Sequence, residues 1–334
     1  MNIKITISHF LKASLLFVLL PIVVVAQNSS DDFQVARTSW GDPDLQGIYN
    51  TATITPFERP AELGDKAFYT PEEVSAIEAG YSADFARQGE EGDTGTYNEF
   101  WYDAGTKLVP NFRTSLITDP PDGQLPAITE YAQAKLADRT LLLRESGTDG
   151  PEMRPLPERC MFWPSTGPPI FPTFYNNNYR IVQSPGVVAI HAEMIHDGRI
   201  IPVSQRGTSE HLSEAITQWV GDSRGYWEDD TLVVETINFI DASKNELGPP
   251  GIRSIRGVGA NNRVIEKFTP TADNLLMYQF TVEDDKTFAS PFTAEFALRA
   301  SAGPIYEYAC HEGNYAMRNV LMGARREEQE VGED

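Results

Sequence analysis

Three short apolar runs separated by tight turns constrain the fold of this chain more than any other feature. They cover residues 179–183, 187–194 and 199–203, and the sequences Ser-Pro-Gly and His-Asp-Gly separate them. Runs of this length bounded by Pro, Gly and Asp are typical of β-strands joined by hairpin turns. A fourth run, residues 231–239, follows a glycine-containing segment. We therefore expect residues 178–239 to form the centre of an antiparallel sheet.

More strands are predicted toward the C-terminus, because residues 274–282 alternate apolar and polar side chains with a period of two. The other runs of this kind are residues 263–269, 291–298 and 305–309. No helix is expected between them, which favours antiparallel pairing. The predicted fold class is mainly β, an antiparallel barrel or sandwich, with a closed lipocalin-like barrel as one form and a few peripheral helices.

Helix signals stand before and after this β-rich part. Thr70 is a good N-cap, Pro71 suits the first helical position and Glu73 completes a capping box, so a helix is expected to about residue 87. Further helices are predicted over residues 129–144 and 315–328, and a short strand over 113–118.

The N-terminal residues 1–26 have the pattern of a secretory signal peptide. Lys4 and Lys12 precede a short apolar run that ends in Val-Val-Ala. The mature protein is therefore expected to be exported, to the periplasm or the extracellular space. Residues 27–150 are interpreted as a wrapping segment and residues 151–334 as the β domain, together one compact unit. No later stretch reaches about 18 apolar residues, so no integral membrane segment is predicted in the mature chain.

The charge of the chain bears on its partners. There are 48 acidic and 27 basic residues, a formal net charge of −21. Such a charge repels nucleic acid, anionic lipid and polyanionic substrates, and it favours solubility. The expected partner is a small-molecule ligand or substrate.

Cys160 and Cys310 are the only cysteines in the sequence. Export would permit a disulfide between them, and closing a loop of about 150 residues would stabilise the fold by about 5 kcal/mol in the chain-entropy model. Two buried thiols are the alternative. Two cysteines are too few for a structural zinc site built on thiolates alone.

A histidine-rich stretch supplies the first candidate site. His191 and Glu193 are two residues apart on a predicted strand and would share a face, while His196 lies at the turn and His211 farther along. A histidine beside a carboxylate suits acid–base catalysis. Structural hydrogen bonding is the bland alternative. A metal site of two histidines and one carboxylate is conceivable with the C-terminal residues below, but the spacing matches no recognised metal motif, and neither a metal nor a cofactor is predicted.

The sequence Gly-Asp-Ser-Arg-Gly-Tyr-Trp at 221–227 supplies the second candidate. Its glycines predict a hairpin turn that needs positive φ, stabilised by a charged pair between Asp222 and Arg224. The pattern Gly-x-Ser-x-Gly would make Ser223 a nucleophile, but a nucleophile elbow precedes a helix and here a strand follows. Candidate substrate-binding residues in or near the predicted sheet and the proline-rich residues 146–178 are Arg159, Tyr175, Trp219, Arg224 and Trp227.

The third candidate is the junction Tyr-Ala-Cys-His-Glu-Gly-Asn at 308–314. His311 and Glu312 lie between a predicted strand and a predicted helix, where site residues are over-represented. A Cys160–Cys310 bond would hold both residues against the proline-rich segment. The candidate catalytic residues are thus His191, Glu193, His196, His311 and Glu312.

These motifs resemble a family of exported bacterial proteins. The matching stretches are residues 43–49, 113–123, 158–160, 179–203, 221–239 and 306–318, and the Gly-Asp-Ser-Arg-Gly-x-Trp motif is the most distinctive. The family has no firmly assigned activity. The resemblance therefore implies export and a β-rich fold and carries over no catalytic residue. This chain has Glu228-Asp229-Asp230 where the family pattern has Glu-Gly-Asp, which puts the detailed geometry of the hairpin in question.

The preferred functional hypothesis is an exported enzyme, a lyase or hydrolase, that acts on a small organic or sugar-like molecule by acid–base catalysis. One alternative is a non-catalytic barrel that binds a small molecule in a pocket of Tyr175, Trp219, Trp227 and Tyr278. Another is an interaction protein of the cell envelope, which would expose an apolar patch of several hundred Å².

Overall fold

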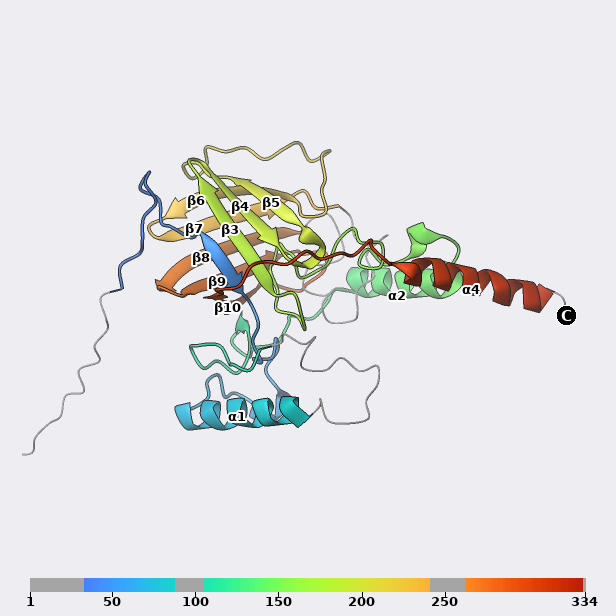
Figure 1. Ribbon diagram of the computed structural model, residues 1–334, viewed down its shortest axis with the longest axis horizontal. Coiled ribbons are helices and arrows are strands. Elements are labelled where there is room, and N and C mark those ends of the chain that lie inside the picture. Colours follow the sequence, from blue (N-terminus) through green and yellow to red (C-terminus); the bar gives the residue numbers. More distant parts are fainter. Residues whose placement is uncertain (1–32, 88–104, 241–261, 333–334) are drawn as a thin grey trace, which may run out of the picture. The chain divides into compact units, whose positions relative to one another are not determined.

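The computed structural model describes residues 33–87, 105–240 and 262–332, so the predicted signal peptide lies outside the described residues. Contacts between residues group Gln34–Asp334 into one compact unit. This unit is mainly antiparallel β-structure, as the alternating sequence pattern predicts (Figure 1).

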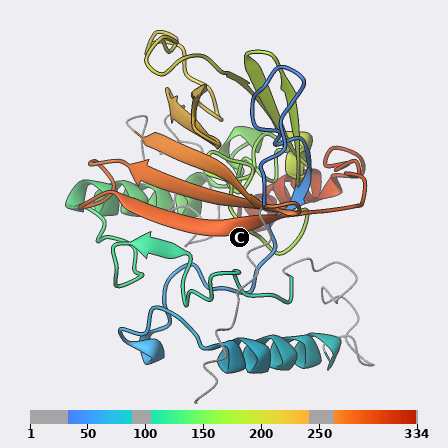
Figure 2. The same ribbon diagram turned by 90° about the vertical axis from the view of Figure 1, so that its left-hand side faces the viewer.

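The strands form one sheet that curls into a nearly closed barrel. The strand order is β5-β4-β3-β1-β10-β9-β8-β7-β6, and β2 pairs with β10. Figure 2 shows β8, β9 and β10, in orange, curving side by side. The strands are β1 (Gly47–Asn50), β2 (Ile117–Asp119), β3 (Asn178–Ser184), β4 (Val187–Ala192), β5 (Gly198–Pro202), β6 (Asp222–Glu228), β7 (Thr231–Ile237), β8 (Arg263–Ala272), β9 (Leu275–Glu283) and β10 (Phe292–Ala300).

The barrel closes where β5 approaches β6. Val203 forms a parallel bridge with Gly225, and the Ser204 N–H donates to the Gly225 carbonyl at 3.0 Å. A Cβ at Gly225 would lie 3.1 Å from side-chain atoms of Ile201 and Val203, so any larger residue here would force these side chains to shift by a few tenths of an ångström.

The prediction that the 221–231 segment is mainly a turn is therefore wrong in part. Only Gly221, at φ +68°, has the positive φ expected of a turn glycine, and Gly225 lies within β6. The turn between β6 and β7 is carried by Asp229 and Asp230, with Asp229 at φ 51°.

Large apolar side chains fill the barrel. On β9, Leu276, Tyr278, Phe280 and Val282 are buried and alternate with partly exposed residues, as the period of two predicts. The ring of Tyr278 contacts Phe268 at 5.0 Å and two other rings, which are those of Phe280 and Phe296.

Three α-helices stand outside the sheet among the described residues, close to their predicted positions. They are α1 (Pro71–Arg87), α2 (Glu130–Ser146) and α4 (Tyr315–Gly332); short 3-10 turns are η1 (Ala61–Leu63), η2 (Pro151–Met153) and η3 (Met194–His196). The predicted capping box of α1 forms: the Thr70 N–H donates to Glu73 at 2.8 Å, and the Glu73 N–H donates to the Thr70 hydroxyl at 3.3 Å. At α2, the Ala132 N–H donates to the Thr129 hydroxyl.

Two predicted strands differ from the structure. Residues 113–118 form a strand only from Ile117, because the Thr114 N–H donates to the Ala67 carbonyl instead of a sheet neighbour. Residues 305–309 form no strand. Their backbone groups bond to side chains instead, as the Tyr306 N–H does with Glu193.

The proline-rich segment is irregular, as predicted, but part of it is buried. Residues 164–170 are inaccessible to solvent and pack against inward-facing tyrosines of the barrel. The Tyr179 hydroxyl donates to the Ser165 carbonyl at 2.7 Å, and the Ile170 N–H donates to the Tyr278 hydroxyl at 2.8 Å. This segment therefore completes the core of the barrel.

Candidate functional site

Glu193 holds two backbone segments together. Its side chain is 3% exposed, accepts a hydrogen bond from the Asn178 amide at 2.7 Å and accepts another from the Tyr306 N–H at 3.2 Å. A buried carboxylate needs such donors. These hydrogen bonds hold the C-terminal segment beside the end of β4, so Glu193 has a structural role.

His191 lies on the outer face of β4. Its neighbours Val188, Ile190 and Ala192 are buried, and His191 alternates with them. Partial burial lowers the pKa of His191, and the positive charge of Arg180 and the nearby His196 lower it further. The ring is therefore held toward its neutral form.

His196, His311 and Glu312 are exposed. His196 Nδ1 lies 3.3 Å from the Tyr308 carbonyl oxygen, which is a second link between the β4–β5 connection and the C-terminal segment. Cys160 and Cys310 form the predicted disulfide, which joins that segment to the proline-rich one. The β4–β5 connection, the C-terminal segment and the proline-rich segment therefore meet. Glu193, however, is occupied by its hydrogen bonds to Asn178 and Tyr306, and the histidines lie near the surface.

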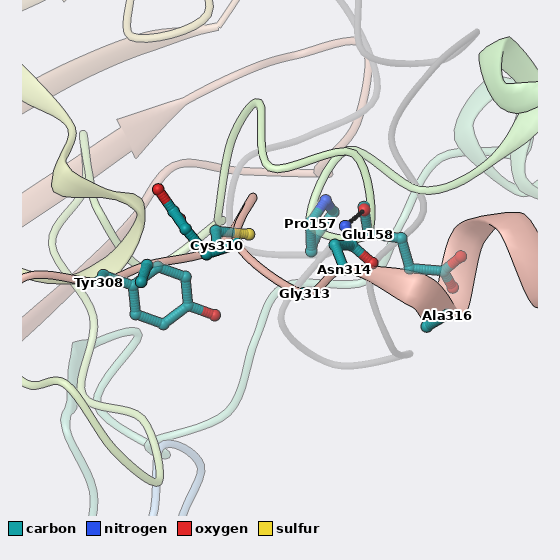
Figure 3. Close-up of a pocket in the computed structure, with 9 residues that line it drawn as sticks. Pro157, Glu158, Tyr308, Cys310, Gly313, Asn314 and Ala316 are labelled. Atoms are coloured by element: carbon teal, nitrogen blue, oxygen red, sulfur yellow. Dashed lines mark hydrogen bonds between the residues drawn. The ribbon is translucent and has the colours of Figure 1, made fainter.

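A cleft of about 590 Å³ lies beside this disulfide (Figure 3). The Asn314 amide donates to the Glu158 carbonyl across it at 2.9 Å, and Glu312 and Tyr308 line it. Its carboxylates are exposed or, for Glu158, bonded by Arg154 at 2.8 Å. The cleft holds no histidine and no paired acid and base.

Most of the candidate substrate-binding residues pack against other parts of the protein. The Trp219 ring stacks on Phe162 with centroids 6.4 Å apart, and the Tyr175 ring lies 6.3 Å from Trp163. Trp227 packs against the hydrophobic core. Arg159 donates to the Glu152 carbonyl at 3.4 Å.

Arg224 leads to a different group of residues, on the outer face of β6, β7 and β8. A cavity of about 240 Å³ opens there, and we call it the His211 cleft. It is lined by Ser204, Gln205, Arg206, Gly207, Ser209, His211, Arg224, Gly225, Tyr226, Glu235 and Arg263.

His211 lies between two carboxylates in this cleft. Its Nδ1 is 2.9 Å from Asp222 Oδ2, its Nε2 is 3.4 Å from Glu235 Oε1, and its side chain is 17% exposed. Asp222 is buried and also accepts the Leu212 N–H at 2.8 Å and an Arg224 N–H at 2.5 Å. The carboxylate of Asp222 is thus fixed, and it orients the imidazole.

The second carboxylate is held in its charged form. Burial raises the pKa of Glu235, but the hydrogen bond and charge of Arg263, with His211 nearby, outweigh burial and place this pKa below its ordinary value. The pKa of Arg263 is raised, chiefly because it donates to Glu235. The cleft therefore places the Glu235 carboxylate, guanidinium groups and the His211 ring within one small cavity.

The interior of the barrel carries a separate polar group. Arg199 on β5 donates to both oxygens of Glu266 on β8, at 2.6 and 2.9 Å, and the Tyr278 hydroxyl donates to Glu266 at 2.8 Å. The exposed fractions of these side chains are 4% or less, and the surrounding rings pack tightly around them. The position of Tyr278 is thus that of a core residue.

Sequence reasoning named Asp222 and Arg224 but not the partner of Asp222, which is His211. The two residues are eleven positions apart, and His211 lies in an irregular connection with no periodic pattern. The sequence feature that points to such a partner is Asp222 itself, because an aspartate that becomes buried needs several hydrogen-bond donors.

Comparisons with known proteins add no assignment: no protein-family model, no curated protein and no solved structure matches this chain. The resemblance to exported bacterial proteins therefore stays a prediction. Within the described residues, no three His, Cys, Asp or Glu side chains are grouped to hold a metal ion. No helix in the described ranges has the length and apolar character of a membrane span.

Proposed function

We propose that this protein is an exported acid–base enzyme, a lyase or hydrolase, that acts on a small organic or sugar-like molecule in the His211 cleft. The observation that carries the proposal is the position of His211, between Asp222 and Glu235 in a cavity of about 240 Å³.

The contacts of the ring define how it would transfer a proton. A neutral imidazole that donates Nδ1–H to Asp222 has an unprotonated Nε2, and a substrate or water O–H that enters between Nε2 and Glu235 would donate to it. Asp222 holds the ring in this tautomer and stabilises the imidazolium that forms, as carboxylates beside catalytic histidines do. Arg224 and Arg263 line the same cleft, where their N–H groups would donate hydrogen bonds to oxygen atoms of the substrate.

Two reactions are open to such a group. In hydrolysis, the ring takes a proton from water as the water oxygen bonds to the substrate, and it returns that proton to the departing oxygen. In elimination, the ring takes a proton from carbon, the C–H electron pair becomes a double bond, and the leaving oxygen departs with its bonding pair.

The size and lining of the cleft indicate a small polar molecule. Its volume is below the roughly 300–1,000 Å³ that drug-sized ligands occupy. Hydroxyl, imidazole, carboxylate and guanidinium groups line it, and Tyr226 adds an aromatic ring. The tightly packed interior of the barrel favours an external cleft over an internal pocket as the place of binding.

The test is a screen of the purified protein with 4-nitrophenyl glycosides and esters for hydrolysis and with oligo-uronates for elimination. His211→Gln and Asp222→Asn are expected to lower kcat/KM at least about 100-fold, with thermal melting to verify folding. His191→Gln and His311→Gln make the same change at the other candidate histidines. Loss of activity in those variants, with full activity in His211→Gln, would overturn the proposal.

A further inference from the structure

A second cavity lies next to the His211 cleft, and Arg263 lines both. Its volume is about 380 Å³. The exposed residues that line it are Asp285, Ala289, Ser290 and Pro291, and the buried Phe288 lies behind them. Arg263 is thus a wall of both cavities, and a ligand that spans its side chain would occupy both.

A row of charged side chains across four strands explains why the cavities adjoin. Arg224 on β6 is paired with Glu235 on β7, and Arg263 on β8 is paired with Glu283 on β9. Arg263 donates to both Glu235 and Glu283, the latter at 2.5 Å. Its guanidinium group is thus held between Glu235 and Glu283, at the border of the two cavities.

Each arginine that lines the cleft already has a carboxylate partner. Arg224 bonds Asp222, and Arg206 lies 3.0 Å from Glu228. Arg263 is shared between Glu235 and Glu283, and Asp285 adds a further negative charge in the second cavity. A carboxylate on the ligand would have to displace one of these partners, whereas hydroxyl groups can bond to them as they stand.

We infer that the ligand is a two-unit hydroxylated molecule without a carboxylate, of disaccharide size, with one unit in the His211 cleft and the other past Arg263. This rests on the proposed function and deepens it. Elimination from a sugar acid needs a cation to neutralise the carboxylate beside the reacting carbon, and these arginines are already neutralised. The inference therefore selects hydrolysis: a water O–H proton passes to His211, the water oxygen bonds to the sugar carbon, and the linking oxygen leaves with its electron pair and takes the proton.

The test is binding, measured by ligand-observed NMR and calorimetry, of named probes. They are glucose, galactose, mannose and xylose, the disaccharides cellobiose, lactose, mannobiose and xylobiose, and digalacturonate. At least one neutral disaccharide is expected to bind about tenfold more tightly than its monosaccharide, and digalacturonate is expected to bind more weakly than any neutral disaccharide that binds.

Ser290→Trp should fill the second cavity. It is expected to reduce disaccharide affinity to that of the monosaccharide and to leave monosaccharide affinity unchanged. Asp285→Trp, at another exposed position of the same cavity, repeats the test if the first variant melts early. His211→Gln should lose turnover of the disaccharide.

Three results would overturn the inference. One is equal affinity for a disaccharide and its monosaccharide, another is tight binding of digalacturonate, and the third is no effect of either tryptophan variant. In these cases, loss of turnover in His211→Gln still supports the proposed function. If no sugar of the panel binds the wild-type protein, the sugar-like substrate of the proposed function fails, and the inference fails with it.

Discussion

Removing the buried guanidinium of Arg199 is expected to destabilise the barrel strongly. Arg199 is 4% exposed and Glu266 is fully buried, and they share two hydrogen bonds. In Arg199→Met the carboxylate keeps only the Tyr278 hydroxyl as a donor. Leaving one charge of a buried pair without its partner costs about 3–5 kcal/mol. That is a large share of the roughly 5–15 kcal/mol that stabilises a typical domain.

A double variant distinguishes the energy of the Arg199–Glu266 interaction from the energy of packing around it. Glu266→Gln alone leaves the Arg199 charge uncompensated and should cost a similar amount. Arg199→Met with Glu266→Gln removes both charges of this pair, and the Gln carbonyl can still accept from Tyr278. The double variant should therefore cost less than the sum of the single variants, by about 2 kcal/mol.

Urea unfolding followed by fluorescence and circular dichroism gives these free energies. A loss of unfolding free energy under about 1 kcal/mol for Arg199→Met would refute the reasoning, because a buried carboxylate without its charged partner destabilises the fold by more than that. So would strict additivity of the two changes, since it would mean that Arg199 and Glu266 do not interact.

Three other changes test the fold. Replacing Cys160 and Cys310 by serine opens a loop of about 150 residues and should lower the free energy of unfolding by about 5 kcal/mol in urea titrations; a change under about 1 kcal/mol would contradict the chain-entropy argument. Gly221→Ala should cost about 2 kcal/mol or more by the same titration, because φ is +68° and a Cβ would lie 2.6 Å from Thr236, and a neutral effect would show that the turn differs. Because the folded-state pKa of His191 is lowered, the unfolded chain takes up the proton first on acidification. Stability should therefore fall as pH drops through the ordinary histidine range near about 6.5, and this dependence should weaken in His191→Gln; an unchanged pH profile would contradict it.

Local sequence signals predicted the elements of this fold well. The period of two in β9 and the capping box of α1 are local patterns that depend on few distant residues. The closure of the barrel could not be derived in the same way, because it depends on the contact of β5 with β6, whose bridge joins Val203 and Gly225. From sequence alone, a glycine within a strand is predicted to be a turn residue, because the neighbouring strand that approaches it closely is not known.

The candidate site was predicted less well, for a physical reason. His191 and Glu193 were predicted to share one face of a strand, but β4 ends at Ala192, and Glu193 accepts hydrogen bonds from Asn178 and Tyr306 instead. The pair that forms, His211 with Asp222, joins an irregular connection to a strand. The conformation of such a connection follows from tertiary contacts that no local pattern encodes.

The proposed function places the ligand against His211 and not against His191, His196 or His311. The most direct measurement is a two-dimensional NMR spectrum of the histidine ring nitrogens, recorded while the tightest-binding sugar is titrated into the protein. We expect the His211 signals to move in proportion to bound ligand and the signals of His191, His196 and His311 to stay in place. Movement of these other signals, with those of His211 unchanged, would contradict it.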